Sequence, residues 1–330
     1  MESVTNFCVS LIKGFIDSLR GVTVLLYLDR EINERALSRS PPADFENSKQ
    51  KQTKVKQESK VLTRVLQSCI LNGFIFLLSI LIFEYGLLPA VKYLVILVFG
   101  HNPGVAHNVW GWMQPFLSMT FRMIWVLPLF LLSKLVNSLW FQDIADSAYR
   151  HRRGRPQFMS SVSKIIADSL FSLLVQALFL VQSMLVSMLP ITYIGELLCL
   201  VHMCLLYSLY SFEYKWFNMG WELHKRLTFI ETNWPYFLGF GLPLAVLTQI
   251  PQSYIISGCV FSIFFPVFIL SGNEATPVTG WVFVTTVVWV SVSSSARVPP
   301  SECPLRLFSG VVALANGLFR LARRRAHDAT

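Results

Sequence analysis

The chain has 330 residues, of which 53% are hydrophobic and only 14% are charged. An average soluble domain carries about 25% charged residues, so in water this chain would expose large apolar patches. The composition therefore excludes an ordinary water-soluble globular protein and indicates lipid as the solvent. The formal net charge is +9, and the placement of the basic residues decides whether that charge concerns nucleic acid or membrane topology.

Lysine and arginine gather in alternate gaps between six apolar stretches. They occur before residue 65, at 150–155, at 215–226 and in the tail, whereas the gaps at 101–114, 190–193 and 251–253 contain none. Cytoplasmic loops of helical membrane proteins carry such an excess of basic residues. We therefore predict an all-α, polytopic helical membrane protein of about six membrane segments, with both termini in the cytosol and no nucleic-acid partner.

The first segment, residues 1–28, predicts an amphipathic helix because apolar positions recur at helical spacing. Lys13, Asp17 and Arg20 fall on the other side of that helix. Such a helix can lie in the membrane interface, which we favour, or it can occupy a groove of a protein partner. The candidate residues for lipid or partner binding on its apolar face are Phe7, Leu11, Phe15 and Leu19.

Residues 29–64 predict a flexible basic cytosolic segment, because they are charged, poor in aromatics and broken by Pro41–Pro42. As a juxtamembrane segment it would fix topology, attract anionic lipid, or offer a basic patch to nuclear-import receptors. The candidate residues for those contacts are Lys49, Lys51, Lys54 and Lys56.

Residues 65–275 predict the helical membrane domain. Full spans are expected at about 65–88, 116–136, 165–189 and 191–212, with an apolar piece at 91–99 in the far interface. The last pair, 237–248 and 254–270, is short or interrupted by glycine and proline. That pattern is typical of a half-penetrating hairpin, although length alone leaves a complete crossing open.

Four residues form a candidate anion site. Arg122 is the one charge in the middle of a predicted span, and such charges mark functional sites by default. Gly239, Gly241 and Pro243 interrupt the next-to-last segment, which would free backbone amides of the kind that coordinate anions in transporters. These residues are the basis for an alternative function as an anion channel or transporter.

No enzyme is expected, and neither a catalytic residue, a cofactor nor a metal is predicted. The six cysteines lack CxxC spacing, and no hydrolase, metalloprotease or nucleotide-binding motif occurs. His202 lies within a predicted span, and we expect it to hydrogen-bond Gln176 or Gln182 rather than to bind metal. Asp143 and Asp146 share a helical face, and we expect them to be solvated or paired with residues 150–155.

Several short segments of the sequence resemble the etoposide-induced family of autophagy-associated transmembrane proteins. That family is more distantly grouped with the bacterial CysZ sulfate-uptake proteins. The resemblance covers residues 1–275, and its main segments are Val126–Phe130, Trp140–Asp146, Ser161–Asp168, Leu205–Tyr210, Asn233–Tyr236, Gly239–Pro243 and Ser253–Cys259. It implies an endoplasmic-reticulum or nuclear-membrane protein acting in autophagy and in p53-linked apoptosis and growth suppression. It also implies anti-apoptotic Bcl-2-type partners and a CysZ-like fold with half-penetrating hairpins.

The resemblance stops at residues 276–304, which we interpret as an atypical insert, and it resumes in the basic cytosolic tail, 305–330. Together these observations predict a non-enzymatic scaffold or regulator that binds membrane lipid and recruits protein partners through its leader and tail.

Overall fold

The computed structural model describes residues 2–38, 61–99, 103–157, 162–188, 190, 192–251, 253–277 and 306–328. Within these ranges the regular elements are helices and no strand occurs, which confirms the predicted all-α class. The predicted patch at Lys49, Lys51, Lys54 and Lys56 lies outside the described residues, as does nearly all of the predicted insert, 276–304.

The helices form two compact units. Unit 1 comprises residues 1–59, 145–247 and 267–330, and unit 2 comprises residues 60–144 and 248–266. Helices α7 (Leu127–Arg153) and α12 (Tyr254–Glu274) each contribute to both units.

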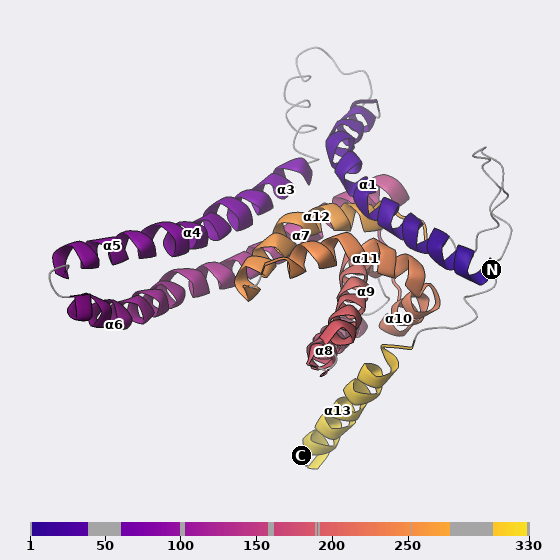
Figure 1. Ribbon diagram of the computed structural model, residues 1–330. Coiled ribbons are helices and arrows are strands. Elements are labelled where there is room, and N and C mark those ends of the chain that lie inside the picture. The colour runs from indigo at the N-terminus through magenta and orange to yellow at the C-terminus, as the bar shows by residue number, and fades with distance from the viewer. Residues whose placement is uncertain are drawn as a thin grey trace. The chain divides into compact units, whose positions relative to one another are not determined.

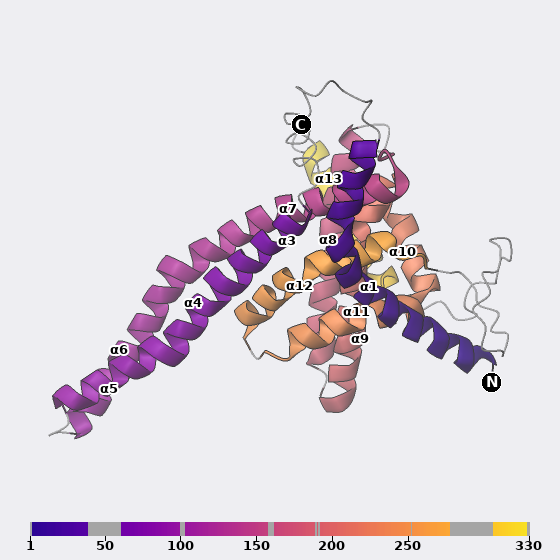
Figure 2. The ribbon, with the colours of Figure 1, turned by 90° about the horizontal axis from the view of Figure 1, so that it is seen from above.

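Unit 2 is built on two long helical stretches that run side by side (Figures 1 and 2). The first is α3 (Val61–Cys69), η1 (Ile70–Leu77), α4 (Leu78–Leu81), η2 (Ile82–Leu87) and α5 (Leu88–Phe99), and the second is α6 (Pro103–Phe121), η3 (Arg122–Val126) and α7. The η elements are π-helical turns: the Leu78 N–H bonds to the Gly73 carbonyl, five residues back. Because these wider turns continue the helix, residues 91–99 are the end of one helical stretch and not a separate piece.

Four small polar side chains join the two stretches of unit 2. Asn72 and Asn137 exchange hydrogen bonds through their side-chain amides, each 3.0 Å long. Ser133 Oγ donates to Asn72 Oδ1 at 2.5 Å, and all of these groups are buried. Ser68 Oγ donates to the Ser262 carbonyl at 3.1 Å. That carbonyl lacks its normal helical donor because residue 266, four positions later, is a proline without an N–H.

Unit 1 surrounds an aromatic core. Helices α8 (Val162–Ser187) and α9 (Thr192–Asn218) form a hairpin, followed by α10 (Leu223–Thr232), α11 (Trp234–Gln249) and the end of α12. Phe212 packs edge-on against Phe237 and Phe240, with ring centroids 5.2 and 4.8 Å apart. The other members of this core include Trp216, Trp221 and Phe229.

A buried arginine ties three helices of unit 1 together. Arg226 is 1% exposed; it donates to Asp168 Oδ2 at 2.9 Å and lies 3.6 Å from Glu213 Oε1. Glu213 also accepts hydrogen bonds from Ser172 and Gln176, both on α8. These contacts join α8, α9 and α10.

The C-terminal helix α13 (Ser309–Asp328) lies along α8. Phe308 stacks on Phe179 with ring centroids 4.2 Å apart, and the Phe308 N–H donates to Glu231 at 2.9 Å. Burial, the largest cause, raises the pKa of Glu231, and the hydrogen bond from Phe308 opposes that rise. The beginning of the predicted tail is therefore part of the packed unit.

Five helical stretches in the described residues are long and apolar enough to cross a membrane. They are Val61–Phe99, Gly104–Arg153, Ser163–Ser187, Tyr193–Asn218 and Tyr254–Glu274. With 16 residues, α11 is shorter than the roughly 20 residues that a full crossing needs. The five spans confirm the prediction of a multi-pass helical membrane protein, and the sixth predicted segment is the short helix α11.

Candidate functional site

The leader helix α1 (Glu2–Ser38) continues ten residues beyond the predicted end at residue 28 and packs along α11 and α12. Its buried stripe recurs at helical spacing and consists mainly of small or polar residues, namely Gly14, Asp17, Ser18, Gly21, Val24 and Leu28. Small residues let helix backbones approach closely. The stripe therefore brings α1 into direct backbone contact with its neighbours.

Three glycines create that contact. A Cβ at Gly14 would lie 2.0 Å from the Tyr236 carbonyl oxygen, and one at Gly239 would lie 2.0 Å from the Leu11 carbonyl oxygen. A Cβ at Gly21 would meet the Val267 carbonyl at 2.0 Å. Hydrogen bonds reinforce the last contact, because Ser271 Oγ donates to the Ser18 carbonyl and accepts from the Gly21 N–H.

Asp17 lies in the middle of this contact and is fully buried. The Tyr236 hydroxyl donates to Asp17 Oδ2 at 2.8 Å, and the Arg20 guanidinium forms an ion pair with Oδ1 at 2.9 Å. Burial, and after it the Asp17 carboxylate, raises the pKa of Tyr236. The tyrosine is thus held as the protonated donor that a buried carboxylate requires.

This packing covers one side of the leader, which sequence reasoning did not expect. Asp17, which sequence reasoning placed on the side opposite the apolar face, lies on the docked side, where Tyr236 and Arg20 compensate its burial. Phe7 contacts Trp234 with ring centroids 5.3 Å apart, and Leu11 lies over Gly239, so both are partly covered. Phe15 and Leu19 remain exposed.

The opposite side of α1 carries an uncovered apolar face, which we call the leader face. Its residues are Ile12, Phe15, Ile16, Leu19, Val22 and Leu26, with exposed fractions between 38% and 76%. These positions are spaced as one face of a helix. The docked stripe holds the helix, and the leader face is the part that can contact lipid or a partner.

The predicted anion site does not form as expected. Helix α11 is continuous from Trp234 to Gln249, with Pro243 inside it. Gly239 and Gly241 are backbone contact points, since a Cβ at Gly241 would lie 1.9 Å from the Cys204 carbonyl oxygen. A proline within a helix leaves a carbonyl without its donor rather than a free amide, so the segment presents no cluster of free N–H groups.

Arg122, the other part of that prediction, lies in η3 of unit 2 and is exposed. No carboxylate among the described residues pairs with it. The side chain is therefore accessible to an anion, but it belongs to unit 2 whereas Gly239, Gly241 and Pro243 belong to unit 1.

Other polar predictions agree with the structure in part. Gln182 Nε2 lies 3.1 Å from His202 Nε2, which confirms the expected hydrogen bond across the α8–α9 hairpin. Asp143 instead pairs with Arg64 at 3.3 Å, and Asp146 accepts a hydrogen bond from Asn218 at 2.8 Å. No group of His, Cys, Asp and Glu in the described chain is arranged to hold a metal ion.

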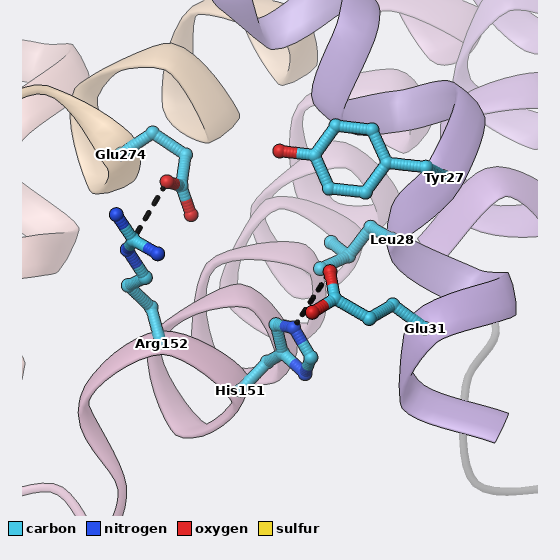
Figure 3. A pocket seen from close by; sticks show the side chains of 6 residues that line it. All are labelled: Tyr27, Leu28, Glu31, His151, Arg152 and Glu274. Carbon is cyan, nitrogen blue, oxygen red and sulfur yellow. Dashed lines mark ion pairs between the residues drawn. The ribbon is translucent and has the colours of Figure 1, made fainter. Parts of the chain in front are cut away.

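Sequence reasoning missed a pocket at the C-terminal half of α1. It is lined by Tyr27, Leu28, Glu31, His151, Arg152 and Glu274, from α1, α7 and α12 (Figure 3). Two ion pairs border it: His151 Nε2 to Glu31 Oε2 at 3.3 Å, and Arg152 Nε to Glu274 Oε2 at 3.2 Å. A signal for the docking of α1 was present, because Gly14 and Ser18 are four apart, the spacing of close helix pairs. No comparable signal marks the pocket, whose residues are far apart in the chain.

These features define a class of protein: a multi-pass helical membrane protein whose N-terminal helix is packed into its own membrane domain. Residues 54–257 match the family model described as Sulfate transporter CysZ/Etoposide-induced protein 2.4, and the chain belongs to this family.

Named relatives support the assignment over most of the chain. Ectopic P granules protein 4 of Caenorhabditis elegans is 30% identical over 275 residues, covering 79% of this chain and 81% of that protein. Protein EI24 homolog of Arabidopsis thaliana is 30% identical over 248 residues, covering 66% of this chain and 76% of that protein. Protein EI24 homolog of Dictyostelium discoideum is 30% identical over 225 residues, covering 67% and 68%. No solved structure matches the chain.

Proposed function

We propose that this protein is a non-enzymatic scaffold of the endoplasmic-reticulum membrane that recruits partners during autophagy and in p53-linked apoptosis and growth suppression. Membership of the family and the sequence resemblance to its autophagy-associated members support this role. The observation that carries it is the leader face, a row of exposed apolar side chains on a helix that is itself firmly docked. A rigid, uncovered helix face is a suitable surface for lipid or for a partner's groove.

Partner recruitment is tested with substitutions on the leader face, because deleting the leader would also remove the buried partner of Tyr236. The triple variant Phe15→Ser, Ile16→Ser and Leu19→Ser changes only exposed positions. In cells lacking the endogenous protein we expect it to reach normal abundance but to restore little autophagic flux. The matched control on the same helix is Arg30→Gln, which removes an exposed ion pair with Glu34.

The tail provides a second arm of that test. Phe308, just before α13, is buried together with Val311 and Ala315 of that helix, whereas Leu314 and Leu318 are exposed. If recruitment uses the tail, Leu314→Ser with Leu318→Ser lowers flux while the leader variant does not. Normal flux and normal partner binding in both variants would contradict the scaffold. Anti-apoptotic Bcl-2-type proteins and import receptors are the partners to be examined by co-purification.

Both termini are proposed to face the cytosol, on the basic residues that end α7. Glycan acceptor sites engineered near Asn108 are expected to be modified, and sites near Gly154 are expected to remain bare. The opposite result would reverse the orientation and with it every cytosolic role of the leader and tail.

The alternative function is an anion channel or transporter. It draws support from the family description, which includes a sulfate transporter, and from the exposed guanidinium of Arg122, with which no carboxylate of the described residues pairs. The predicted break at Gly239–Pro243 gives this function no support, because helix α11 is continuous there. Purified protein in liposomes would pass sulfate, and Arg122→Ala would change the flux. Vesicles that stay sealed with the wild-type protein would exclude this function.

A further inference from the structure

The pocket between α1, α7 and α12 has a chemical character that the proposed function does not use. Its cavity is about 150 Å³ in volume. Figure 3 shows the carboxylates of Glu31 and Glu274, the Tyr27 ring and hydroxyl, and the side chains of His151 and Arg152 around one space. Leu28 forms an apolar wall and is 1% exposed.

The charges around this space favour a ligand that carries both signs. Each wall already holds a contact between a basic and an acidic side chain: Arg152 pairs with Glu274, and His151 lies against Glu31, a contact that is an ion pair when the imidazole is protonated. A simple anion or a simple cation that entered would leave one partner of a pair without its counter-charge, and the cost falls on Glu274, whose side chain is only 16% exposed. A zwitterion avoids that cost, because its cation binds the carboxylate and its anion binds the basic side chain that the carboxylate releases.

The hydrogen-bonding groups favour a primary ammonium as the cation. A carboxylate can accept about four hydrogen bonds, so two carboxylates match an –NH₃⁺ group, which has three donors. A trimethylammonium group is larger, donates no hydrogen bond, and is normally held by a cage of several aromatic rings. The described lining of this pocket offers one phenol ring, Tyr27, and one imidazole, His151, which already lies against Glu31.

The surroundings of the Tyr27 hydroxyl show that this side of the pocket is negatively charged. Burial is the largest cause that raises the pKa of its hydroxyl, followed by the carboxylates of Glu274 and Glu31, while Arg152 opposes them. The phenol is therefore a protonated group that faces two carboxylates, and a cation placed beside it would be attracted to that face.

The pocket also lies at the end of the candidate span Tyr254–Glu274, whose 21 residues are about the length of one crossing. The ends of membrane spans lie at the level of the lipid headgroups. Arg150 and Arg153, which flank the pocket residues His151 and Arg152, are exposed and basic, as a phosphate requires. A headgroup with an ammonium and a phosphate therefore fits both the pocket and its place in the chain.

We propose that this pocket binds a phosphoethanolamine group, with its primary ammonium between Glu31 and Glu274 and its phosphate at Arg152. The site goes beyond the scaffold function and does not depend on it. The same chemistry can come from the headgroup of phosphatidylethanolamine or from a free phosphoethanolamine-type molecule, and the test distinguishes these sources.

In the lipid arm, purified full-length protein is placed in nanodiscs of phosphatidylcholine and phosphatidylethanolamine, and the lipid retained after detergent washing is analysed. We expect phosphatidylethanolamine to be enriched about tenfold, which corresponds to about 1.4 kcal/mol. In the soluble arm, O-phosphoethanolamine and phosphocholine are titrated calorimetrically into protein in detergent. Enrichment in the first arm assigns the lipid, and binding only in the second arm assigns the free molecule.

The variants are Glu274→Gln, which removes a carboxylate charge at constant size, and Tyr27→Phe, which removes one hydroxyl. The second variant keeps the test decisive if the first fails to fold. The matched control is Glu34→Gln, because Glu34 lies on α1 one turn beyond the pocket and, within the described residues, forms an ion pair with the exposed Arg30. Both pocket variants should lose the enrichment and the control should keep it. Equal retention of the two lipids together with no soluble binding would overturn the proposal, as would an equal loss in Glu34→Gln.

Discussion

The tightest backbone contacts at glycine lie in unit 1, although Gly154, Gly310 and Gly317 of unit 1 are open and Gly73 of unit 2 has a side-chain neighbour at 3.3 Å. In unit 1, a Cβ at Gly14, Gly21, Gly239 or Gly241 would lie 1.9 to 2.0 Å from a backbone carbonyl oxygen of a neighbouring helix. In unit 2, a Cβ at Gly86, Gly104, Gly111 or Gly258 would meet nothing within 4 Å. Unit 1 is therefore held by close helix-to-helix packing, whereas much of the side-chain surface of unit 2 faces outward and is left for lipid.

The two units also differ in the charge of their buried polar groups. Unit 1 buries charges, with Arg226 between Asp168 and Glu213 and with Asp17 below Tyr236. Unit 2 buries uncharged groups, the side chains of Ser68, Asn72, Ser133 and Asn137. A charge that loses its partner is far more costly than an amide that does so. Single substitutions should therefore have larger effects in unit 1.

The largest effect is expected for Arg226→Met. This change leaves two carboxylates, Asp168 and Glu213, without their shared cation, and the loss of one partner of a buried pair costs about 3–5 kcal/mol. Thermal unfolding in detergent, followed by the helical circular dichroism signal, measures the loss of stability. The control is Arg30→Met, whose ion pair is exposed. Similar melting temperatures for the two variants would refute the buried network.

The next effect is expected for Gly239→Ala. The added methyl group would lie 2.0 Å from the Leu11 carbonyl oxygen, which belongs to backbone and cannot rotate away. Overpacking of this kind costs about 1–3 kcal/mol, and it should detach α1 from α11. Limited proteolysis of the leader, followed by mass spectrometry, measures the detachment. A leader that resists proteolysis as well as wild type would show that the two backbones are not in contact.

A smaller effect is expected for the amide pair of unit 2. Asn72→Leu and Asn137→Leu should each be destabilising, while the double variant should be less damaging than the sum of the two. Interhelical hydrogen bonds in membranes contribute about 0.6 kcal/mol on average and about 1.7 kcal/mol at most. A double-mutant cycle of unfolding free energies in detergent measures the coupling. Strict additivity would mean that the two amides do not interact.

Much of the architecture could be predicted from the sequence because hydropathy and length determine which segments cross a membrane. The hairpin of α8 and α9 was expected at 165–189 and 191–212 and is found at Val162–Ser187 and Thr192–Asn218. The hydrogen bond between Gln182 and His202 was also expected, since a buried imidazole needs a partner and the tight turn at Pro190 brings the two helices together.

The faces of the leader could not be predicted in the same way. Helical periodicity separates apolar from polar positions but does not say which side is covered, and here the covered side contains Asp17 while Phe15 and Leu19 are exposed. Charged side chains usually lie on the uncovered side of a helix. Asp17 is an exception because it accepts a hydrogen bond from Tyr236, which is 219 residues away in the chain. The glycines of α11 were misread for a related reason: glycine and proline suggest a break, and only the neighbouring backbones of Leu11 and Cys204 explain them as contacts.

The smallest predicted effect is a gain in stability, and it has the opposite sign to that of Gly239→Ala. Gly111 lies inside α6, and a Cβ there would meet open space. Alanine in a helix interior is more favourable than glycine by about 0.5–1 kcal/mol, so Gly111→Ala should slightly raise the unfolding temperature. The substitution is chemically identical to that at Gly239, and only the surroundings differ. If both variants shift the melting temperature in the same direction, the contrast between a closely packed unit 1 and an open unit 2 is wrong.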